Sequence, residues 1–291
     1  MEYLPNQSNN YFNFYFNPQH LPDLIRCGPV SATVLKRIKD PFRYIFTPAE
    51  PVSPSMLAGS LVDCLWLEPE KFQDRYTVLP PDAPAKPTSR QINAKKPSDA
   101  TIKAIEFWKN LESQNKTIIT ANEAKEGTTA AKALADHSIA KVLHARSDKQ
   151  VVLRGDCPLL NNQYENQVVQ AQAMLDMYDK SEATVIDLKQ THDVSSHAID
   201  KTVVRYEYFL QMAFYRKCLR SAGLPCDKAV LIFQRSAPPY DVHVKQLDEE
   251  YLAFGETLCQ VRLDLLKTIH PKTLADNQIE TLTIPSYLAK S

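Results

Sequence analysis

The sequence predicts an α/β fold in which helices flank a small, mixed but mostly antiparallel sheet. Three strand-like runs follow one another at residues 150–154, 168–177 and 183–190. In the second run the odd positions are apolar and the even positions mostly polar, which is the pattern of a strand with one buried face. Helical patterns come before and after these runs. Helix, three strands, helix and strand in this order is typical of an α/β core.

In the first third of the chain, the sequence pattern predicts two helices followed by a loop. Ser31 begins a short helix that ends before Pro41, because proline cannot continue a helix from within. A second helix is expected over about 55–67. Residues 79–98 contain five prolines and four basic residues, which predicts a loop.

The rest of the chain supplies the core. Helical spacing resumes at about 102–111, and a capping box at residues 120–123 opens an alanine-rich helix that ends near residue 144. After the three strands, the pattern predicts one long helix, two short strands and a final helix, over 198–220, 229–234, 240–244 and 249–268. We expect one domain over 1–291, made of a helical part (1–80), a loop rich in proline and lysine (81–100) and a core (101–291).

Composition excludes several classes of protein. Lysine plus arginine and aspartate plus glutamate both total 34, so a binder that grips nucleic acid by bulk positive charge is disfavoured. The six glycines are isolated, which excludes the P-loop and the dinucleotide fingerprint. No two of the six cysteines form a C-x-x-C pair, so neither a zinc ribbon nor an iron–sulfur cluster is predicted. Scattered cysteines, with no apparent signal or membrane span, lead us to expect a cytoplasmic protein.

Two aspartates and a lysine form the main candidate site. Asp187 and Lys189 are two residues apart in an apolar strand, so their side chains should point to the same face. Asp176 lies eleven residues upstream on the polar face of the preceding strand. A tight turn between the strands would bring the two carboxylates together, where they repel unless a cation lies between them. Mg²⁺ binds such oxygen ligands and keeps water for chemistry, and Lys189 would orient or help deprotonate that water.

Other interpretations of these residues are weaker or less specific. A D-x-K triplet arises by chance in most proteins of this length, and alone it indicates a surface carboxylate beside a surface lysine. Asp156 is an alternative second acid, but thirty-one residues separate it from Asp187, too many for a tight hairpin. His192 and His197 lack the spacing of a zinc site.

From Val185 to Tyr215 the sequence resembles the core of the PD-(D/E)XK nucleases. In more detail it is similar to the exodeoxyribonuclease VIII (RecE) type of phage and prophage recombination exonucleases, and this similarity covers nearly the whole chain. Its most specific part is Tyr206-x-Tyr208 followed by Gln211 and Tyr215. Further matching stretches are residues 30–35 with 40–42, residues 59–63 with 67–72, residues 118–120, residues 237–240 and residues 282–285.

The resemblance implies an activity and a set of roles. It implies a metal-dependent exonuclease that degrades linear double-stranded DNA, with 5′→3′ polarity, to expose strands for recombination by annealing. The metal would be Mg²⁺, or Mn²⁺ in its place, held by Asp63, Asp176, Asp187 and the Leu188 carbonyl. Lys189, Gln211 and Tyr215 would complete the catalytic group, the last two as a Q-x-x-x-Y motif. Implied partners are duplex DNA ends, a RecT-like single-strand annealing protein and further copies in a ring-shaped trimer or tetramer.

Two departures from the family pattern leave alternatives open. Asp63 stands where the family usually has a histidine ligand, and as a hard oxygen donor it suits Mg²⁺ at least as well. Gln150 stands where the family often has glutamate. A different PD-(D/E)XK nuclease, acting as an endonuclease or in repair, and an inactive DNA-binding or scaffold relative are therefore the rival hypotheses.

Local charge suggests where DNA would lie. Six basic residues stand against two acidic ones from Lys86 to Lys109, and five against one from Lys201 to Arg220. Such segments could hold phosphates without reading bases, although each lysine could equally belong to a solvated helix face. The residues predicted to contact DNA are Arg90, Lys95, Lys96, Arg205, Tyr208 and Arg216.

Overall fold

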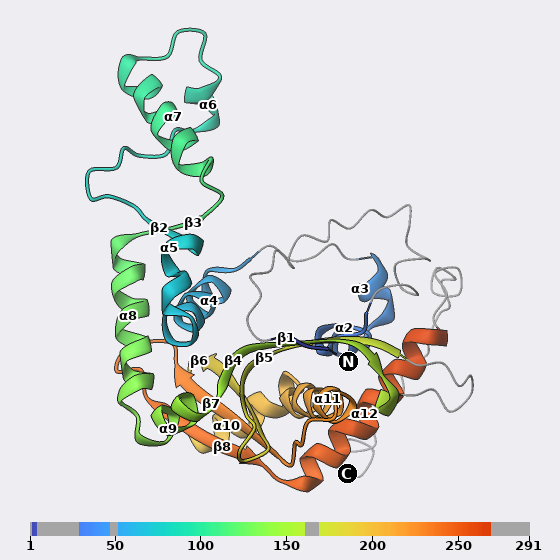
Figure 1. Cartoon of the computed structure of the whole chain (residues 1–291). Helices are drawn as coiled ribbons and strands as arrows, with labels where there is room; N and C mark the ends of the chain where they lie inside the picture. The colour runs from blue at the N-terminus through green and yellow to red at the C-terminus, as the bar shows by residue number, and fades with distance from the viewer. Residues whose placement is uncertain (1, 5–28, 47–51, 161–168, 269–291) are drawn as a thin grey trace, which may run out of the picture.

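A twisted six-stranded sheet forms the centre of the molecule, as the computed structural model of the chain shows (Figure 1). The structure describes residues 2–4, 29–46, 52–160 and 169–268. The strands lie in the order β1-β4-β5-β6-β7-β8, and all neighbours are antiparallel except β6 and β7. Their bounds are β1 Glu2–Leu4, β4 Asp148–Cys157, β5 Val169–Asp179, β6 Thr184–Thr191, β7 Lys228–Arg235 and β8 Val242–Leu247.

The predicted fold class is confirmed, and so is the alternation on the central strand. Along β5, Val169, Ala171, Ala173 and Leu175 are buried while Gln170 and Met174 are exposed. The three consecutive strands pair as predicted, with β5 between β4 and β6. The parallel pair β6 and β7 needs a crossover, because parallel strands cannot be joined by a tight turn. The crossover consists of α10 (Ser196–Arg205) and α11 (Tyr208–Ser221).

Helices cover both faces of the sheet. On one face α11 packs with α2 (Ala32–Arg37) and α12 (Glu249–Thr268), and their side chains form the larger core with alternate residues of the strands. On the other face lie α4 (Pro54–Leu67), α8 (Ala121–Asp136) and α9 (Ser138–Arg146). Residues of β7 divide between the two cores, with Leu231 in the first and Ile232 in the second, as the two-residue period of a strand requires.

Two predicted helices are each divided in the structure. The expected helix over 198–220 breaks between α10 and α11, because Glu207 adopts left-handed backbone angles (φ 50°, ψ 45°). The Glu207 carboxylate binds Arg262 at 3.1 Å and Lys39 at 3.8 Å, which stabilises the break. The alanine-rich helix divides at His137, whose backbone is extended and whose Nδ1 accepts a hydrogen bond from the Ala140 backbone as the cap of α9. The prediction of single helices here was wrong.

A hairpin of two helices stands away from the sheet (Figure 1). It consists of α6 (Ser89–Ile92) and α7 (Asp99–Glu112). Its first helix lies in the segment predicted as a loop, and its second confirms the helical spacing predicted at about 102–111. Lys86 pairs with Glu112 at 2.7 Å and lies 5.3 Å from the ring centroid of Trp108, which donates to the Pro84 carbonyl. These contacts hold the proline-rich segment against α7.

The remaining elements join the hairpin to the core or extend α2. They are α3 (Pro41–Phe46), α5 (Phe72–Arg75) and the parallel pair β2 (Tyr76–Val78) and β3 (Thr117–Ile119), with 3₁₀ turns at Pro69–Lys71 and Pro158–Leu160. The predicted stretch at 282–285 and the last part of the predicted core, 269–291, lie outside the described residues. Among the described helices, none is long and apolar enough to cross a bilayer.

Candidate active site

The backbone ladder between β5 and β6 ends at the two predicted acids. The antiparallel register runs from Asp179 opposite Thr184 to Met177 opposite Ile186, so the next opposed pair is Asp176 and Asp187. There the Leu188 N–H donates to Asp176 Oδ2 at 2.8 Å, and the aspartate side chain takes the place of the next ladder bond. The tight turn predicted from the eleven-residue spacing therefore brings both carboxylates to one place in the sheet.

A distortion in β4 lies directly opposite Asp176. Lys149 pairs with Met177 and Val151 with Leu175, which places Gln150 across from Asp176. Gln150 has a φ of 49°, a left-handed conformation that is unusual for a residue with a side chain. Leu175 and Met177 belong to different cores, although residues two apart on a regular strand share a face. The sheet is thus kinked at Asp176.

Asp187 and Lys189 share one face of β6, as predicted, and α11 completes the group. The Lys189 ammonium is ion-paired with Asp187 Oδ2. Gln211 Nε2 donates to Asp187 Oδ1 at 3.0 Å and contacts the Tyr215 hydroxyl at 2.8 Å. Asp187 is 2% exposed, so a single buried carboxylate is held from one side by the strand lysine and from the other by the helix amide.

Electrostatics show that negative charge is crowded here. Burial and the neighbouring charges of Asp187 and Asp63 raise the pKa of Asp176 well above its usual range. Burial, with a contribution from Asp187, raises the pKa of Asp63 to about 7, although Lys189 opposes the shift. Burial lowers the pKa of Lys189, but the attraction of Asp187 and Asp176 outweighs it, so the net shift is upward. Lys189 is therefore an ammonium at neutral pH.

The donor atoms suit a hard divalent cation. Asp63 on α4 lies near enough for the charges of Asp187 and Lys189 to act on it. Asp187 Oδ2 is buried and is ion-paired with the Lys189 ammonium. Carboxylate oxygens are what Mg²⁺ prefers, and a cation would relieve their repulsion. As the side chains stand, however, the described part of the chain holds no group of three or more acidic, histidine or cysteine side chains close enough to bind a metal.

A groove lined by basic and aromatic side chains leads away from the site. It runs past the end of β6 and along α10, and Tyr208, Tyr206, Arg205, Lys201 and His192 line it. The Tyr208 ring stacks on Tyr206 with centroids 5.7 Å apart, and the Arg205 guanidinium lies 5.4 Å from the Tyr206 centroid. Tyr208 itself is 4.9 Å from the Lys189 ammonium. The predicted DNA contacts Arg205 and Tyr208 therefore line one groove, and Tyr208 also lies beside the candidate catalytic lysine.

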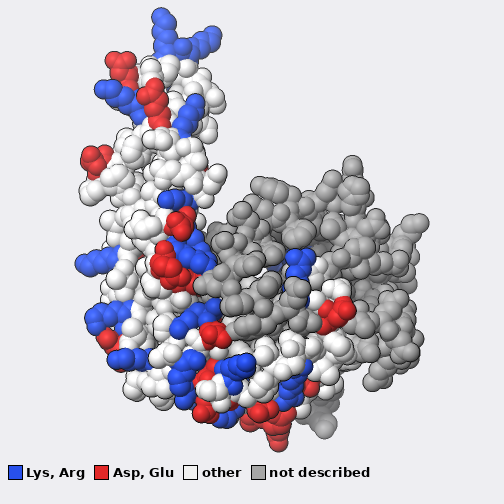
Figure 2. Space-filling model, in the orientation of Figure 1, with Lys and Arg blue, Asp and Glu red and all other residues white. Residues whose placement is uncertain are grey.

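Three of the other predicted DNA contacts are on the α6–α7 hairpin and do not line this groove. Arg90, Lys95 and Lys96 are exposed on the α6–α7 hairpin. Figure 2 shows Lys and Arg side chains at the tip of this hairpin, with acidic ones among them.

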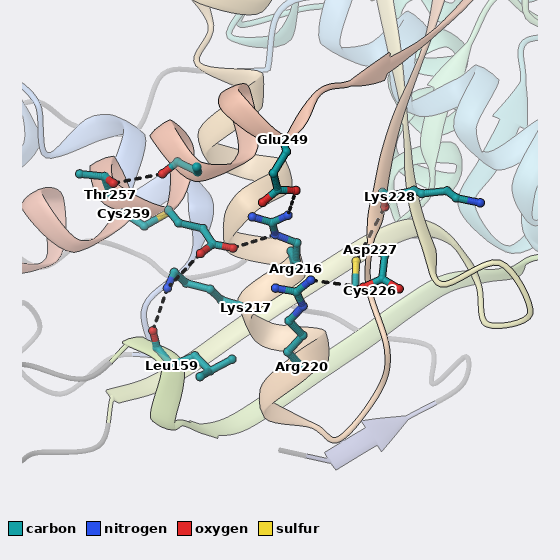
Figure 3. Close-up of polar contacts among 12 residues, drawn as sticks. Leu159, Arg216, Lys217, Arg220, Cys226, Asp227, Lys228, Glu249, Thr257 and Cys259 are labelled. Carbon is teal, nitrogen blue, oxygen red and sulfur yellow. Dashed lines mark hydrogen bonds and ion pairs between the residues drawn. The ribbon is translucent and has the colours of Figure 1, made fainter.

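The prediction that Arg216 contacts DNA is wrong. Arg216 is 2% exposed and bonds to Glu256 at 2.7 Å and Glu249 at 2.8 Å, on α12 (Figure 3). Lys217 and Arg220, from the same basic segment, pair with Glu256 and Asp227. The positive charge in the second half of this segment is neutralised by Glu249 and Glu256 of α12 and by Asp227, the residue before β7. It does not form a surface for phosphate.

One residue of the site was missed by sequence reasoning. Lys36 on α2 donates to Gln211 Oε1 at 2.7 Å and lies 5.0 Å from the Tyr208 ring centroid. It is 175 positions from Gln211 in sequence, and it belongs to no motif with a catalytic spacing. Only the packing of α2 on α11 brings it to the site, so no local signal could have identified it.

Comparison with known proteins adds a family and a fold. The model of a family described as "PDDEXK-like domain of unknown function (DUF3799)" matches residues 47–278. No curated protein matches the chain. A crystal structure from Eubacterium rectale, named "Putative exonuclease", has a TM-score of 0.53 at 12% identity over 98% of this chain and 99% of its own. At that identity the likeness concerns the fold alone.

A second solved structure is less similar. It is that of a phage related exonuclease from Haemophilus somnus 129PT, at 15% identity and a TM-score of 0.28 over 64% of this chain and 91% of its own. That TM-score is too low to carry an argument.

Proposed function

Because the chain belongs to the PDDEXK-like family DUF3799, we propose that it is a metal-dependent nuclease that hydrolyses phosphodiester bonds in DNA. The observation that carries the proposal is the placement of Asp176, Asp187 and Lys189. They meet where the β5–β6 ladder ends, with Gln211 and Tyr215 of α11 against them. Carboxylates that hold a cation and a lysine close to the phosphate can together promote phosphodiester hydrolysis.

The acidic residues would hold the cation. Asp63, Asp176, Asp187 and the Leu188 carbonyl are the candidate ligands, for Mg²⁺ or for Mn²⁺ in its place. When bound, such an ion polarises the phosphate and makes its water a stronger nucleophile at neutral pH. Burial, and after it the neighbouring carboxylates, raise the pKa values of Asp63 and Asp176, and a bound cation would favour the charged form of both.

Lys189 acts as a fixed positive charge. Since its pKa is raised, it holds its proton at neutral pH and does not serve as a base. Its ammonium would orient the attacking water and stabilise the negative charge that gathers on the phosphate oxygens as the bond breaks. Gln211 and Tyr215 keep Asp187 in place, because the Gln211 amide donates to Asp187 Oδ1 and contacts the Tyr215 hydroxyl.

The groove along α10 supports a path for the strand. Arg205 and Lys201 would hold phosphates, while Tyr206, 50% exposed, offers a surface for a base or sugar. The exposed Arg90, Lys95 and Lys96 on the α6–α7 hairpin would contact the backbone of the duplex. None of these contacts reads base sequence, which suits an enzyme that degrades DNA of any sequence.

The finer part of the proposal is an exonuclease that works 5′→3′ from the ends of linear duplex DNA. It rests on the sequence resemblance to the exodeoxyribonuclease VIII type, as do a ring-shaped trimer or tetramer and a RecT-like annealing partner. An inactive DNA-binding relative is the second candidate. It is favoured by the contact between Lys189 and Asp187, and by the lack of a three-ligand cluster among the described residues.

The experiment uses linear duplex DNA labelled at either the 5′ or the 3′ end, with circular duplex as the control. Wild type is assayed with Mg²⁺, with Mn²⁺ and with EDTA, beside Asp187→Asn. The proposal expects metal-dependent loss of linear DNA that the variant lacks, and release of the 5′ label first. Cleavage of circular DNA would indicate an endonuclease. Metal-dependent binding without cleavage would favour the inactive relative.

A further inference from the structure

Lys36 reaches the site from the N-terminal part of the chain. Its neighbours Leu35 and Ile38 are fully buried in the core between α2 and α11, so the position of the helix is fixed by packing. The Lys36 side chain extends to Gln211 Oε1 at 2.7 Å and to the ring of Tyr208. Tyr208 is thus contacted by two ammonium groups, with Lys36 at 5.0 Å and Lys189 at 4.9 Å from its centroid.

Positive charge at Lys36 is poorly compensated. Among the described residues, no carboxylate forms an ion pair with it, whereas Lys39 pairs with Glu207 and Lys189 with Asp187. Burial and the charge of Lys189 lower the pKa of Lys36 to about 7, although the charges of Asp187 and Glu207 act in the opposite direction. A half-buried ammonium without a counter-ion is costly, and an anion in the site would remove that cost.

The contact with Gln211 also fixes which way its amide points. Oε1 accepts from Lys36, and Nε2 donates to Asp187. A flipped amide would put NH₂ against the ammonium and the oxygen against the carboxylate, and both contacts would be repulsive. Lys36 therefore belongs electrostatically to the site and is more than a surface lysine that reaches across it.

We propose that Lys36 is a second active-site lysine that binds a phosphate of the DNA strand. The phosphate supplies the negative charge that Lys36 lacks, and Tyr208 and Gln211 hold the ammonium ready for it. This inference deepens the proposed nuclease function and rests on it for the identity of the ligand. A purely structural lysine would need only the Gln211 contact and would be indifferent to DNA.

Binding of a linear duplex oligonucleotide in EDTA tests the inference without hydrolysis. Each phosphate contact contributes about −0.9 to the slope of log affinity against log salt. Lys36→Met removes the charge and keeps most of the side chain, so we expect the slope to become shallower by about 0.9. Lys36→Arg keeps the charge, so its slope should equal that of wild type. Lys132→Met is the matched control, because that exposed lysine on α8 already pairs with Asp136.

The outcomes separate this inference from the function on which it rests. An unchanged slope in Lys36→Met, or an equal loss of binding in Lys36→Met and Lys36→Arg, would overturn the proposed phosphate contact. Lys36 would then have a structural role alone. Lys36→Gln is a second neutral variant, for the case that Lys36→Met does not fold, because its amide can still donate to Gln211. It should show the same shallower slope as Lys36→Met. If the slope changes but wild type cleaves no DNA with Mg²⁺, then the phosphate contact stands and the nuclease proposal fails.

Discussion

Two glycines in helix interiors allow the packing of α11 to be measured. In α12, a Cβ added at Gly255 would lie 2.6 Å from the Phe209 carbonyl oxygen and 2.8 Å from the Ala213 Cβ, both on α11. In α4, a Cβ at Gly59 would meet only Gln190 Oε1, at 3.9 Å. The same substitution, Gly→Ala, is therefore blocked by a neighbouring helix at one position and has room at the other.

The magnitude follows from two opposing terms. In a helix interior Ala is more favourable than Gly by about 1 kcal/mol, which applies at both positions. At Gly255 the new methyl group is on the order of 1 Å too close to backbone atoms that cannot rotate away, and overpacking of this kind costs about 1–3 kcal/mol. We expect Gly59→Ala to raise the free energy of unfolding by up to about 1 kcal/mol. At the upper end of the overpacking cost, about 3 kcal/mol, the gain of about 1 kcal/mol in helix propensity leaves a net loss, so Gly255→Ala should lower the free energy of unfolding by about 2 kcal/mol.

Urea unfolding of the two variants and wild type measures both effects. The helix-propensity term cancels in the difference between the variants, so that difference isolates the cost of pushing α12 away from α11. We expect about 2–3 kcal/mol, close to the upper end of the overpacking range. If Gly255→Ala were as stable as Gly59→Ala, the close approach of the two helices would be refuted. In that case the tight packing of α12 on the helix that carries Gln211 and Tyr215 would also be refuted.

Two further predictions concern charged residues. Asp179 is fully buried in the β5–β6 turn, and Ser181, Glu182 and Arg146 hold its pKa below the ordinary value although burial opposes them. Asp179→Ala should cost about 2–4 kcal/mol at pH 7, and Asp179→Asn, which keeps the acceptor, about 1 kcal/mol. Because the pKa is depressed, this stabilisation is complete above the unfolded pKa of about 3.9 and is lost as pH falls through the folded value. An alanine penalty in urea unfolding that does not decrease as the pH is lowered below the unfolded pKa would contradict this. For Arg216→Met we expect an unchanged salt dependence of DNA binding, measured by anisotropy, because the guanidinium is buried against α12. The exposed Arg205→Met should make the slope shallower by about 0.9, and an equal effect of both variants would restore Arg216 as a DNA contact.

Local patterns predicted the sheet and the acidic pair well. The alternation along β5 and the spacing between Asp176 and Asp187 depend on neighbouring residues, because a tight turn and a two-residue period fix which side chains meet. Their meeting, and the common face of Asp187 and Lys189, could therefore be predicted from the sequence.

The features that the sequence could not reveal depend on contacts between distant segments. The break between α10 and α11 is held by the Glu207 carboxylate, which binds Arg262 of α12 and Lys39 in the turn after α2. Arg216 looked like part of a basic surface, because the acids that neutralise it are on α12. Lys36 reaches the site only because α2 packs on α11, and no local sequence pattern indicates that packing. In each case an ion pair or hydrogen bond between remote residues determines the outcome, and periodicity contains no information about it.

The central claim is that the Asp176, Asp187 and Lys189 site cleaves DNA with the help of a divalent cation. Its most direct test is the initial rate of nucleotide release from linear duplex DNA by wild type with Mg²⁺, compared with Asp187→Asn under the same conditions. We predict a rate that EDTA abolishes and that the variant lowers by at least about a hundredfold, while the variant's urea unfolding remains cooperative. A wild-type rate that is absent, or equal to that of Asp187→Asn, would contradict the claim.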